Sequence, residues 1–149
     1  MCTVRAWTEL LEERWGSRQH YLRWENPTTW QILDEVGIAY DTTLGFADHI
    51  GFRCGTCREF PVFNLKTRQA LRLRERPLVV MDVTMLTNKY MGLQPEEALE
   101  QIRWLADKCR LYGGNFGLLW HNTILVEEFR RKLYLSCLET LLYKVGVLG

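Results

Sequence analysis

Three polar residues stand where apolar stretches of the sequence end. Asp82 and His121 each follow a run that predicts a buried strand, and Asp41 follows a shorter one. In folds built from parallel strands, chemistry gathers at the carboxyl ends of the strands, where the connecting loops meet. A carboxylate beside an imidazole fixes the tautomer of the ring and favours its protonated form. Asp82 and His121 together therefore indicate a general acid.

These residues also have purely structural interpretations. Asp41 could belong to a turn or cap a helix. His121 could be a core histidine whose ring bonds a backbone carbonyl. The type and position of the residues leave both interpretations open.

An irregular stretch from Asp41 to Glu59 holds further candidates. It has neither helical nor strand periodicity, and connections of this length are often functional. Arg53 lies within it, with Asp48 and His49 nearby. Its rigid fork of donors could orient a catalytic carboxylate, or it could simply hold the loop by bonding backbone carbonyls.

A C-x-x-C motif, Cys54 to Cys57, lies in the same stretch. In a redox enzyme the first cysteine of such a motif opens a helix, but residues 58–63 have the pattern of an extended chain. A structural zinc site would need a second ligand pair, and the other cysteines and the histidines form no close pair. Redox chemistry stays a minor alternative.

The elements that would position these residues alternate along the chain. Strands are expected at 38–40, 60–65, 77–82 and 115–120, and helices at 8–15, between Asn26 and Gly37, from Pro95 to about Arg110, and at 126–144. The basic run Lys66–Arg76 is expected to be a solvated surface segment with a helical turn. The expected core faces of the last three helices are Trp30, Leu33 and Val36; Ala98, Ile102, Leu105, Ala106 and Cys109; and Phe129, Leu133, Cys137 and Leu141.

This order of elements predicts an α/β fold in which parallel strands alternate with helices. The strands are too few for a barrel of eight, so a partial (β/α) barrel is expected, formed by residues 1–149 as one domain. The 149 residues carry a formal net charge of +1, which gives no field to attract nucleic acid. No apolar run is long enough for a membrane span, and the five scattered cysteines fit the cytoplasm.

Several segments resemble one known family. Ser17–Trp24, Ala39–Asp48 and Gly51–Thr56 are similar to the later part of a bacterial branch of the polysaccharide deacetylases, which are carbohydrate esterases. The similarity continues through Pro77–Asp82 and Leu119–His121, so it covers nearly the whole chain. The resemblance implies an incomplete, distorted (β/α) barrel that hydrolyses N-acetyl or O-acetyl groups on sugars with a divalent metal, often zinc.

The resemblance also implies roles for single residues. His121 matches the acid histidine of a Leu-x-His motif, and Asp82 matches the aspartate that tunes it. Arg53 is similar to the arginine that orients the base, although the usual Arg-x-Pro-Tyr is Arg-Cys-Gly-Thr here. Three further residues would line the substrate site: His20, Asp48 and Trp120.

The sequence departs from the family at the metal site. The family takes its base and one ligand from an Asp-Asp pair and its other ligands from His-x-x-x-His, and this sequence contains neither. Because both motifs belong upstream of the residues present, we expect a barrel that lacks its N-terminal strands, binds no metal alone and is inactive alone. The expected partners are an acetylated polysaccharide or lipopolysaccharide sugar, and an upstream half or a second copy.

A different class of function is a metal-free module that binds glycans or completes a partner. The aromatic content supports it, with Trp24, Trp120 and Phe52 as candidate sugar platforms. Structural burial is the alternative for each of the three.

Overall fold

The computed structural model describes residues 15–143, and these divide into two compact units. Unit 1 comprises the chain up to Thr43 together with Phe60–Glu75. Unit 2 comprises Leu44–Glu59 and the chain from Arg76 onward. The predicted helix at 8–15 falls almost wholly outside the described residues.

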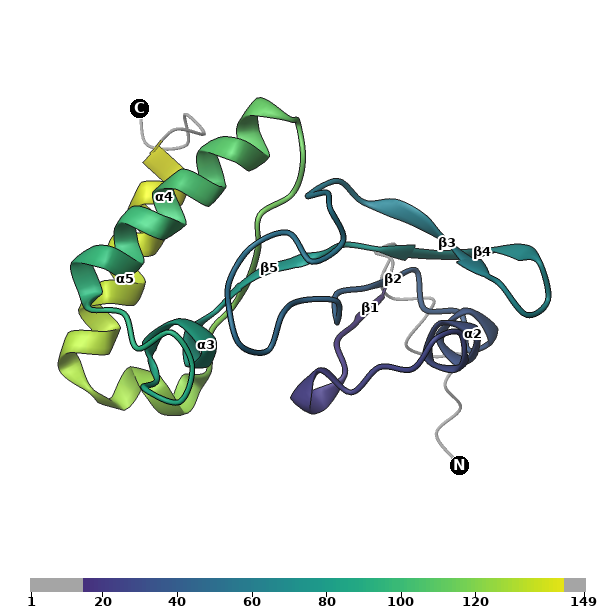
Figure 1. Cartoon of the computed structure of the whole chain (residues 1–149), viewed down its shortest axis with the longest axis horizontal. Helices are drawn as coiled ribbons and strands as arrows, with labels where there is room; N and C mark the ends of the chain where they lie inside the picture. Colours follow the sequence, from purple (N-terminus) through teal and green to yellow (C-terminus); the bar gives the residue numbers. More distant parts are fainter. Residues whose placement is uncertain (1–14, 144–149) are drawn as a thin grey trace. The chain divides into compact units, whose positions relative to one another are not determined.

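Unit 1 is built on a small mixed sheet (Figure 1). Its strands lie in the order β1 (Gly16–Ser17), β2 (Tyr40–Asp41), β4 (Gln69–Glu75) and β3 (Phe60–Asn64). The pairs β1–β2 and β2–β4 are parallel, whereas β3 and β4 form an antiparallel hairpin.

Strand β4 corrects the prediction of a helical surface turn at Lys66–Arg76. Arg72 is exposed, while Leu73 is fully buried and Glu75 is also buried. This alternation is the two-residue period of a strand with one face in the core. The charged residues on the outer face conceal that period in the sequence.

Helix α2 (Thr28–Glu35) covers the sheet of unit 1 with its buried Trp30 and Leu33, as predicted. The chain leaves the helix through Gly37, whose φ of +82° lies in the left-handed region that glycine tolerates. One detail of the prediction is wrong: Val36 is 69% exposed because it lies past the last helical residue. Pro27 occupies the N-cap without a side-chain capping bond.

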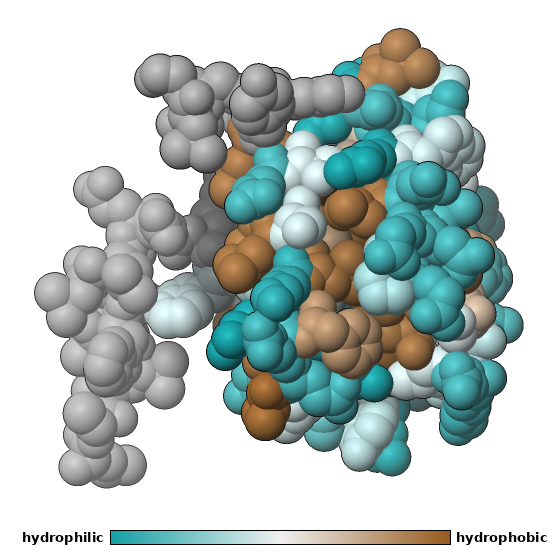
Figure 2. Space-filling model, turned by 90° about the vertical axis from the view of Figure 1, so that its left-hand side faces the viewer, coloured by the Kyte–Doolittle hydropathy of each residue, from teal (hydrophilic) through white to brown (hydrophobic). Residues whose placement is uncertain are grey.

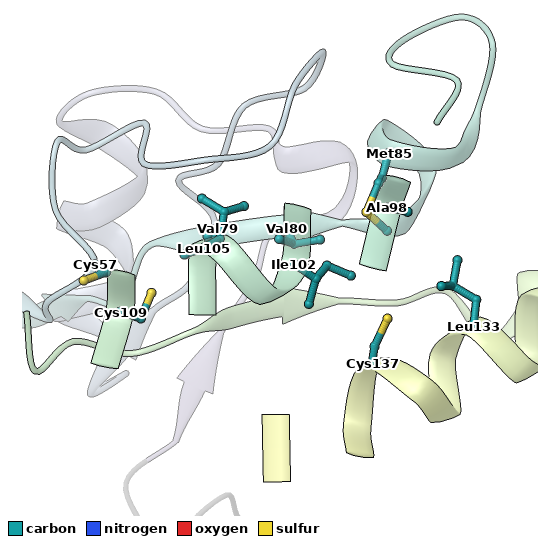
Figure 3. Packing of buried hydrophobic residues seen from close by; sticks show 10 residues of the cluster. All are labelled: Cys57, Val79, Val80, Met85, Ala98, Ile102, Leu105, Cys109, Leu133 and Cys137. Carbon is teal, nitrogen blue, oxygen red and sulfur yellow. The ribbon is translucent and has the colours of Figure 1, made fainter. Parts of the chain in front are cut away.

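Unit 2 has one parallel strand pair packed against helices. Its elements are β5 (Leu78–Met81), α3 (Asp82–Leu86), α4 (Pro95–Leu111), β6 (Gly117–Leu119), η2 (Asn122–Val126) and α5 (Glu128–Tyr143). Residues of β5, α3, α4 and α5, together with Cys57 of the irregular loop, form the core that Figure 3 shows. All five residues of the stripe predicted for α4 are buried, and Gln94 and Glu97 form a capping box at its start.

Helix α5 confirms its predicted core side only in part. Leu133 and Cys137 are buried, but Phe129 is 50% exposed. Phe129 stands in the first turn of the helix, where the Arg130 guanidinium lies 5.5 Å from its ring centre.

The described strands form two separate sheets and close no barrel, so the observed class is a mixed α/β fold with parallel pairs. The partial barrel stays a prediction. No described helix has the length and apolar character that crossing a membrane requires. On the side where α4 and α5 lie, apolar groups interrupt the polar surface (Figure 2).

Candidate functional site

The parallel pair of unit 2 brings Asp82 and His121 together. Met81 and Leu119 are register partners at the ends of β5 and β6. Asp82 follows as the first residue of α3, and His121 follows two residues after β6. Two residues that are 39 positions apart in sequence thus meet because their strands end side by side.

The Asp82 carboxylate is held by three hydrogen bonds. His121 Nδ1 lies 2.6 Å from Oδ1, the His121 backbone N–H donates to Oδ2 at 2.7 Å, and the Val83 backbone N–H donates to Oδ1 at 2.7 Å. Asp82 is fully buried, whereas 39% of the His121 side chain is exposed. Backbone donors fix the carboxylate, and the carboxylate in turn fixes the imidazole.

This geometry decides which ring nitrogen can do chemistry. Because Nδ1 carries its proton toward Asp82, Nε2 is the nitrogen left to accept or donate a proton at the surface. Among the described residues, none hydrogen-bonds to Nε2. The pair is therefore a histidine–aspartate dyad with one open nitrogen, the arrangement that general acid–base catalysis requires.

The irregular loop runs beside β5 and reaches the dyad end of that strand. Leu78 N–H donates to Leu44 O at 2.9 Å, and Gly51 N–H donates to Val79 O at 2.8 Å. Between these anchors, the Thr84 hydroxyl of α3 donates to Ala47 O at 2.9 Å. The loop tip is thus fixed against the same short helix that begins with Asp82.

Asp48, at this loop tip, pairs with its neighbour His49 instead of joining the dyad. Its Oδ1 lies 2.8 Å from His49 Nδ1, and both side chains are exposed. The hydrogen bond with His49 lowers the pKa of Asp48 below its usual range. Phe46 stacks on the His49 ring at a centroid distance of 3.7 Å, which orders this second pair.

Arg53 bonds the loop backbone. Its Nη1 donates to Gly45 O at 2.9 Å, and its described hydrogen bonds include none to Asp82 or His121. This contact corresponds to the alternative in which Arg53 holds the loop together. A role in orienting a base stays a prediction.

Trp120 and His20 are the remaining predicted substrate residues. Trp120 packs against the core of unit 2 and against the Tyr134 ring at 5.1 Å, with its buried Nε1 bonded to none of the described residues. His20 belongs to unit 1, in the short 3-10 turn η1 (His20–Leu22), where it lies against the Tyr21 ring. Of the predicted site residues in unit 2, Asp82 and His121 are the two that hydrogen bonds join to each other.

Within residues 15–143, no group of three or more histidine, cysteine, aspartate or glutamate side chains could hold a metal ion.

Unit 1 contains a cluster of two carboxylates that the sequence did not reveal. Asp41 and Glu75 are register partners on β2 and β4, and both are fully buried. Trp30 Nε1 donates to Glu75 Oε2 at 3.1 Å, and the Thr43 hydroxyl donates to Asp41 Oδ1 at 2.7 Å. The sequence gives no signal for this cluster, because Glu75 lies in the basic run that was predicted to be a surface segment. Only the pairing of β2 with β4 brings Glu75 opposite Asp41.

The two carboxyl groups of this cluster share a closed environment. Burial raises the pKa of Asp41, while hydrogen bonds from Thr43 and Thr42 and the contact with Glu75 oppose that rise. Asp41 Oδ2 receives no hydrogen bond from the described residues. A proton on one carboxyl would let it donate to the other, which satisfies that oxygen.

The cation beside this cluster is Arg18. Burial lowers the pKa of its guanidinium, and the charges of Asp41 and Glu75 oppose that effect. Its Nε donates to the Thr42 carbonyl at 3.2 Å and to the Thr42 hydroxyl at 3.0 Å.

The two cysteines of the C-x-x-C motif differ in their surroundings. Cys57 is 4% exposed and lies beside Cys109 of α4, while Cys54 is half-buried. Burial raises the pKa of the Cys109 thiol to about 12, with the neighbouring Cys57 adding to the rise. The chain after the motif enters strand β3 rather than a helix, as the sequence predicted.

Comparison with known proteins found no matching family model, curated protein or solved structure. The candidate site is therefore defined by its own geometry: a surface histidine oriented by a buried aspartate at the ends of two parallel strands.

Proposed function

We propose that His121 transfers protons in a hydrolase that removes acetyl groups from sugars, of the polysaccharide deacetylase type. The observation that carries the proposal is the dyad, in which a fully buried carboxylate with three donors orients a partly exposed imidazole. Such an imidazole can protonate the departing sugar oxygen or nitrogen as an acetyl group is cleaved. The hydrogen bond to Asp82 holds the imidazole ring in its orientation during this transfer.

The proposal covers the proton-transfer part of the reaction. Carbonyl activation and the base that activates water would come from a partner, either an upstream deacetylase half or a second chain, because the sequence has no Asp-Asp pair and no His-x-x-x-His. The proposed substrate is an acetylated polysaccharide or lipopolysaccharide sugar. The proposed compartment is the cytoplasm, which the scattered cysteines of the sequence fit.

The test uses an activated ester, 4-nitrophenyl acetate, whose leaving group needs neither a metal nor an acid. Its hydrolysis therefore reports the open Nε2 of His121 as a proton acceptor for the attacking water, the reverse direction of the same proton transfer. The full chain should accelerate its hydrolysis, and His121→Asn should abolish the protein-dependent rate. Asp82→Asn should lower that rate by about tenfold or more, since an amide no longer fixes the tautomer. On an acetylated chito-oligosaccharide the chain alone should release no acetate.

The exposed pair Asp48 and His49 supplies the matched control. Its nitrogen–oxygen distance of 2.8 Å is close to that of the dyad, but both side chains are exposed. His49→Asn should therefore leave the rate unchanged. Equal losses in His49→Asn and His121→Asn would overturn the proposal, because any surface histidine would then account for the activity. A tight stoichiometric zinc site that depends on histidine would contradict the need for a partner.

A second candidate is the glycan-binding module. The observation in its favour is a pocket in unit 2 that is lined by aromatic side chains and includes neither Asp82 nor His121.

A further inference from the structure

Helix α4 carries a second side-chain stripe that the core does not use. Trp104, Lys108 and Tyr112 are spaced four residues apart, so they lie on one face, while the buried stripe occupies another. Trp104 is 56% exposed and Tyr112 is 60% exposed. Exposed aromatic rings gathered on one helix face are a feature of ligand-binding surfaces, whereas single scattered rings are not.

A loop segment faces this stripe and completes a pocket. The pocket has a volume of about 440 Å³ and is lined by Trp104, Lys108 and Tyr112 on one side and by Phe52 and Gly55–Arg58 on the other. Ligand sites for small molecules have volumes of roughly 300–1,000 Å³ and are lined mainly by aromatic and apolar groups.

The loop wall is fixed before any ligand binds. Asn115 N–H donates to Cys57 O at 2.8 Å, and Gly55 N–H donates to Phe52 O at 2.9 Å. A Cβ on Gly114 would lie 2.2 Å from Cys57 Sγ, so the chain after α4 packs directly onto the loop. A pre-formed wall lowers the conformational entropy that a ligand must overcome.

Two cations stand in this pocket without acidic partners. Arg58 Nε donates to Tyr112 O at 2.6 Å, which anchors the guanidinium and occupies a carbonyl at the negative end of α4. Nη1 and Nη2 of Arg58 bond no described acceptor, and Lys108 Nζ forms no ion pair with a described residue but lies 5.4 Å from the Trp104 ring centre. No described acidic side chain lines the pocket. Glu100, one turn before Trp104, lines a neighbouring hollow.

We propose that this pocket, defined by Phe52, Arg58, Trp104, Lys108 and Tyr112, binds a small anion built on a ring, such as a uronic acid residue of an acidic glycan. The ring lies against the aromatic side chains, and its carboxylate lies between Arg58 and Lys108. A guanidinium with two free nitrogens binds a carboxylate in bidentate fashion. The site is independent of the His121 dyad and of the proposed hydrolase.

The proposal is tested by titrating the full chain with three probes. Binding is monitored through the amide and indole N–H signals in NMR spectra. The probes are an oligogalacturonate, a neutral chito-oligosaccharide and benzoate, each to millimolar concentration. Saturable shifts of the Trp104 indole and of the 55–58 amides with oligogalacturonate or benzoate support the site and identify the type of ring. No saturable shift with either anion, or equal binding of the neutral sugar, overturns it.

Matched variants separate this site from general surface effects. Trp104→Ala and Lys108→Glu should each weaken binding by about tenfold or more, since one aromatic face or one charge-assisted bond is lost. Lys132→Glu removes another exposed lysine, which pairs with Glu128 on α5, and should leave affinity unchanged. Equal weakening by Lys132→Glu would overturn the proposal. His121→Asn should bind normally, so loss of the esterase function and loss of this site are distinguishable.

Discussion

Asp41 in unit 1 and Asp82 in unit 2 are two strand-end carboxylates with different surroundings. Both are fully buried. Asp41 accepts a hydrogen bond from the Thr43 hydroxyl, and Asp82 accepts one from the Val83 backbone N–H. Asp82 contacts the imidazole of His121, whose side chain is 39% exposed. Asp41 instead meets the buried Glu75.

The difference shows what turns a buried carboxylate into a candidate site. A buried charge can act on a substrate only through a group that reaches the surface, and His121 is such a group. The Asp41–Glu75 pair is fully buried, and the Thr43 hydroxyl and Trp30 Nε1 donate hydrogen bonds to it, so its ionisation bears on folding. Substitutions at the two positions should therefore have effects of different kinds.

The largest effect is expected for Asp82→Ala. The substitution leaves the backbone N–H groups of Val83 and His121 and the Nδ1–H of His121 without their acceptor. At about 1 kcal/mol or more for each unsatisfied donor, the free energy of unfolding should fall by about 3 kcal/mol. Chemical denaturation followed by circular dichroism measures it. Asp48→Ala, which breaks the exposed histidine pair, should lower the free energy of unfolding by much less; an equal loss there would refute the special role of Asp82.

A smaller effect is expected for Trp30→Phe, which keeps an aromatic ring but removes the donor to Glu75. Because the buried Glu75 carboxylate loses a hydrogen bond, the free energy of unfolding should fall by about 2 kcal/mol. Trp120→Phe is the matched control, because its buried Nε1 bonds no described acceptor. Thermal and denaturant unfolding should show a clearly smaller loss for Trp120→Phe. If the two variants lose the same amount, the Trp30–Glu75 bond contributes nothing.

The pH dependence of Asp41 should be opposite in sign to that of an ordinary surface aspartate. Burial raises its pKa, so the native state keeps the Asp41 proton at a pH where the unfolded chain has lost it. Its contribution to stability is fully present below the unfolded pKa of about 3.9 and declines as pH rises toward the raised native value. Asp41→Asn should remove this decline, as denaturation at a series of pH values can show.

Asp48 provides the control for that sign. The bond to His49 lowers the pKa of Asp48, so its contribution is present above the unfolded pKa and is lost as pH falls. Asp48→Asn should therefore change the acid limb of the stability profile in the opposite direction. Profiles of the two variants with the same slope would show that the Asp41–Glu75 pair is not a closed proton site.

The smallest expected effect concerns thiol reactivity within unit 2. Burial raises the pKa of both Cys109 and Cys137 to about 12. Iodoacetamide at mildly alkaline pH should therefore modify the half-buried Cys54 first and these two only on unfolding, as peptide mapping measures. Rapid alkylation of Cys109 in the native state would revive the redox alternative and would show that the core of unit 2 is open.

The sequence was sufficient where a pattern is local. The five-residue apolar stripe of α4, its proline start and the buried run before Asp82 follow from helix and strand periodicity, and the structure confirms them. Strand β4 was missed because alternating arginines concealed its inward residues, and the exposed Phe129 was misplaced because helix ends pack less than helix centres.

What the sequence by itself determined is the set of chemical groups: an aspartate and a histidine that each end an apolar run, and aromatic and basic residues at regular helical spacing. Only the tertiary structure decided which of them act together. The parallel register of β5 and β6 places Asp82 against His121, and the register of β2 and β4 places Glu75 beside Asp41. The loop before β3 forms a pocket together with the outer stripe of α4. These pairings join residues tens of positions apart, and no local pattern encodes the register that brings them into contact.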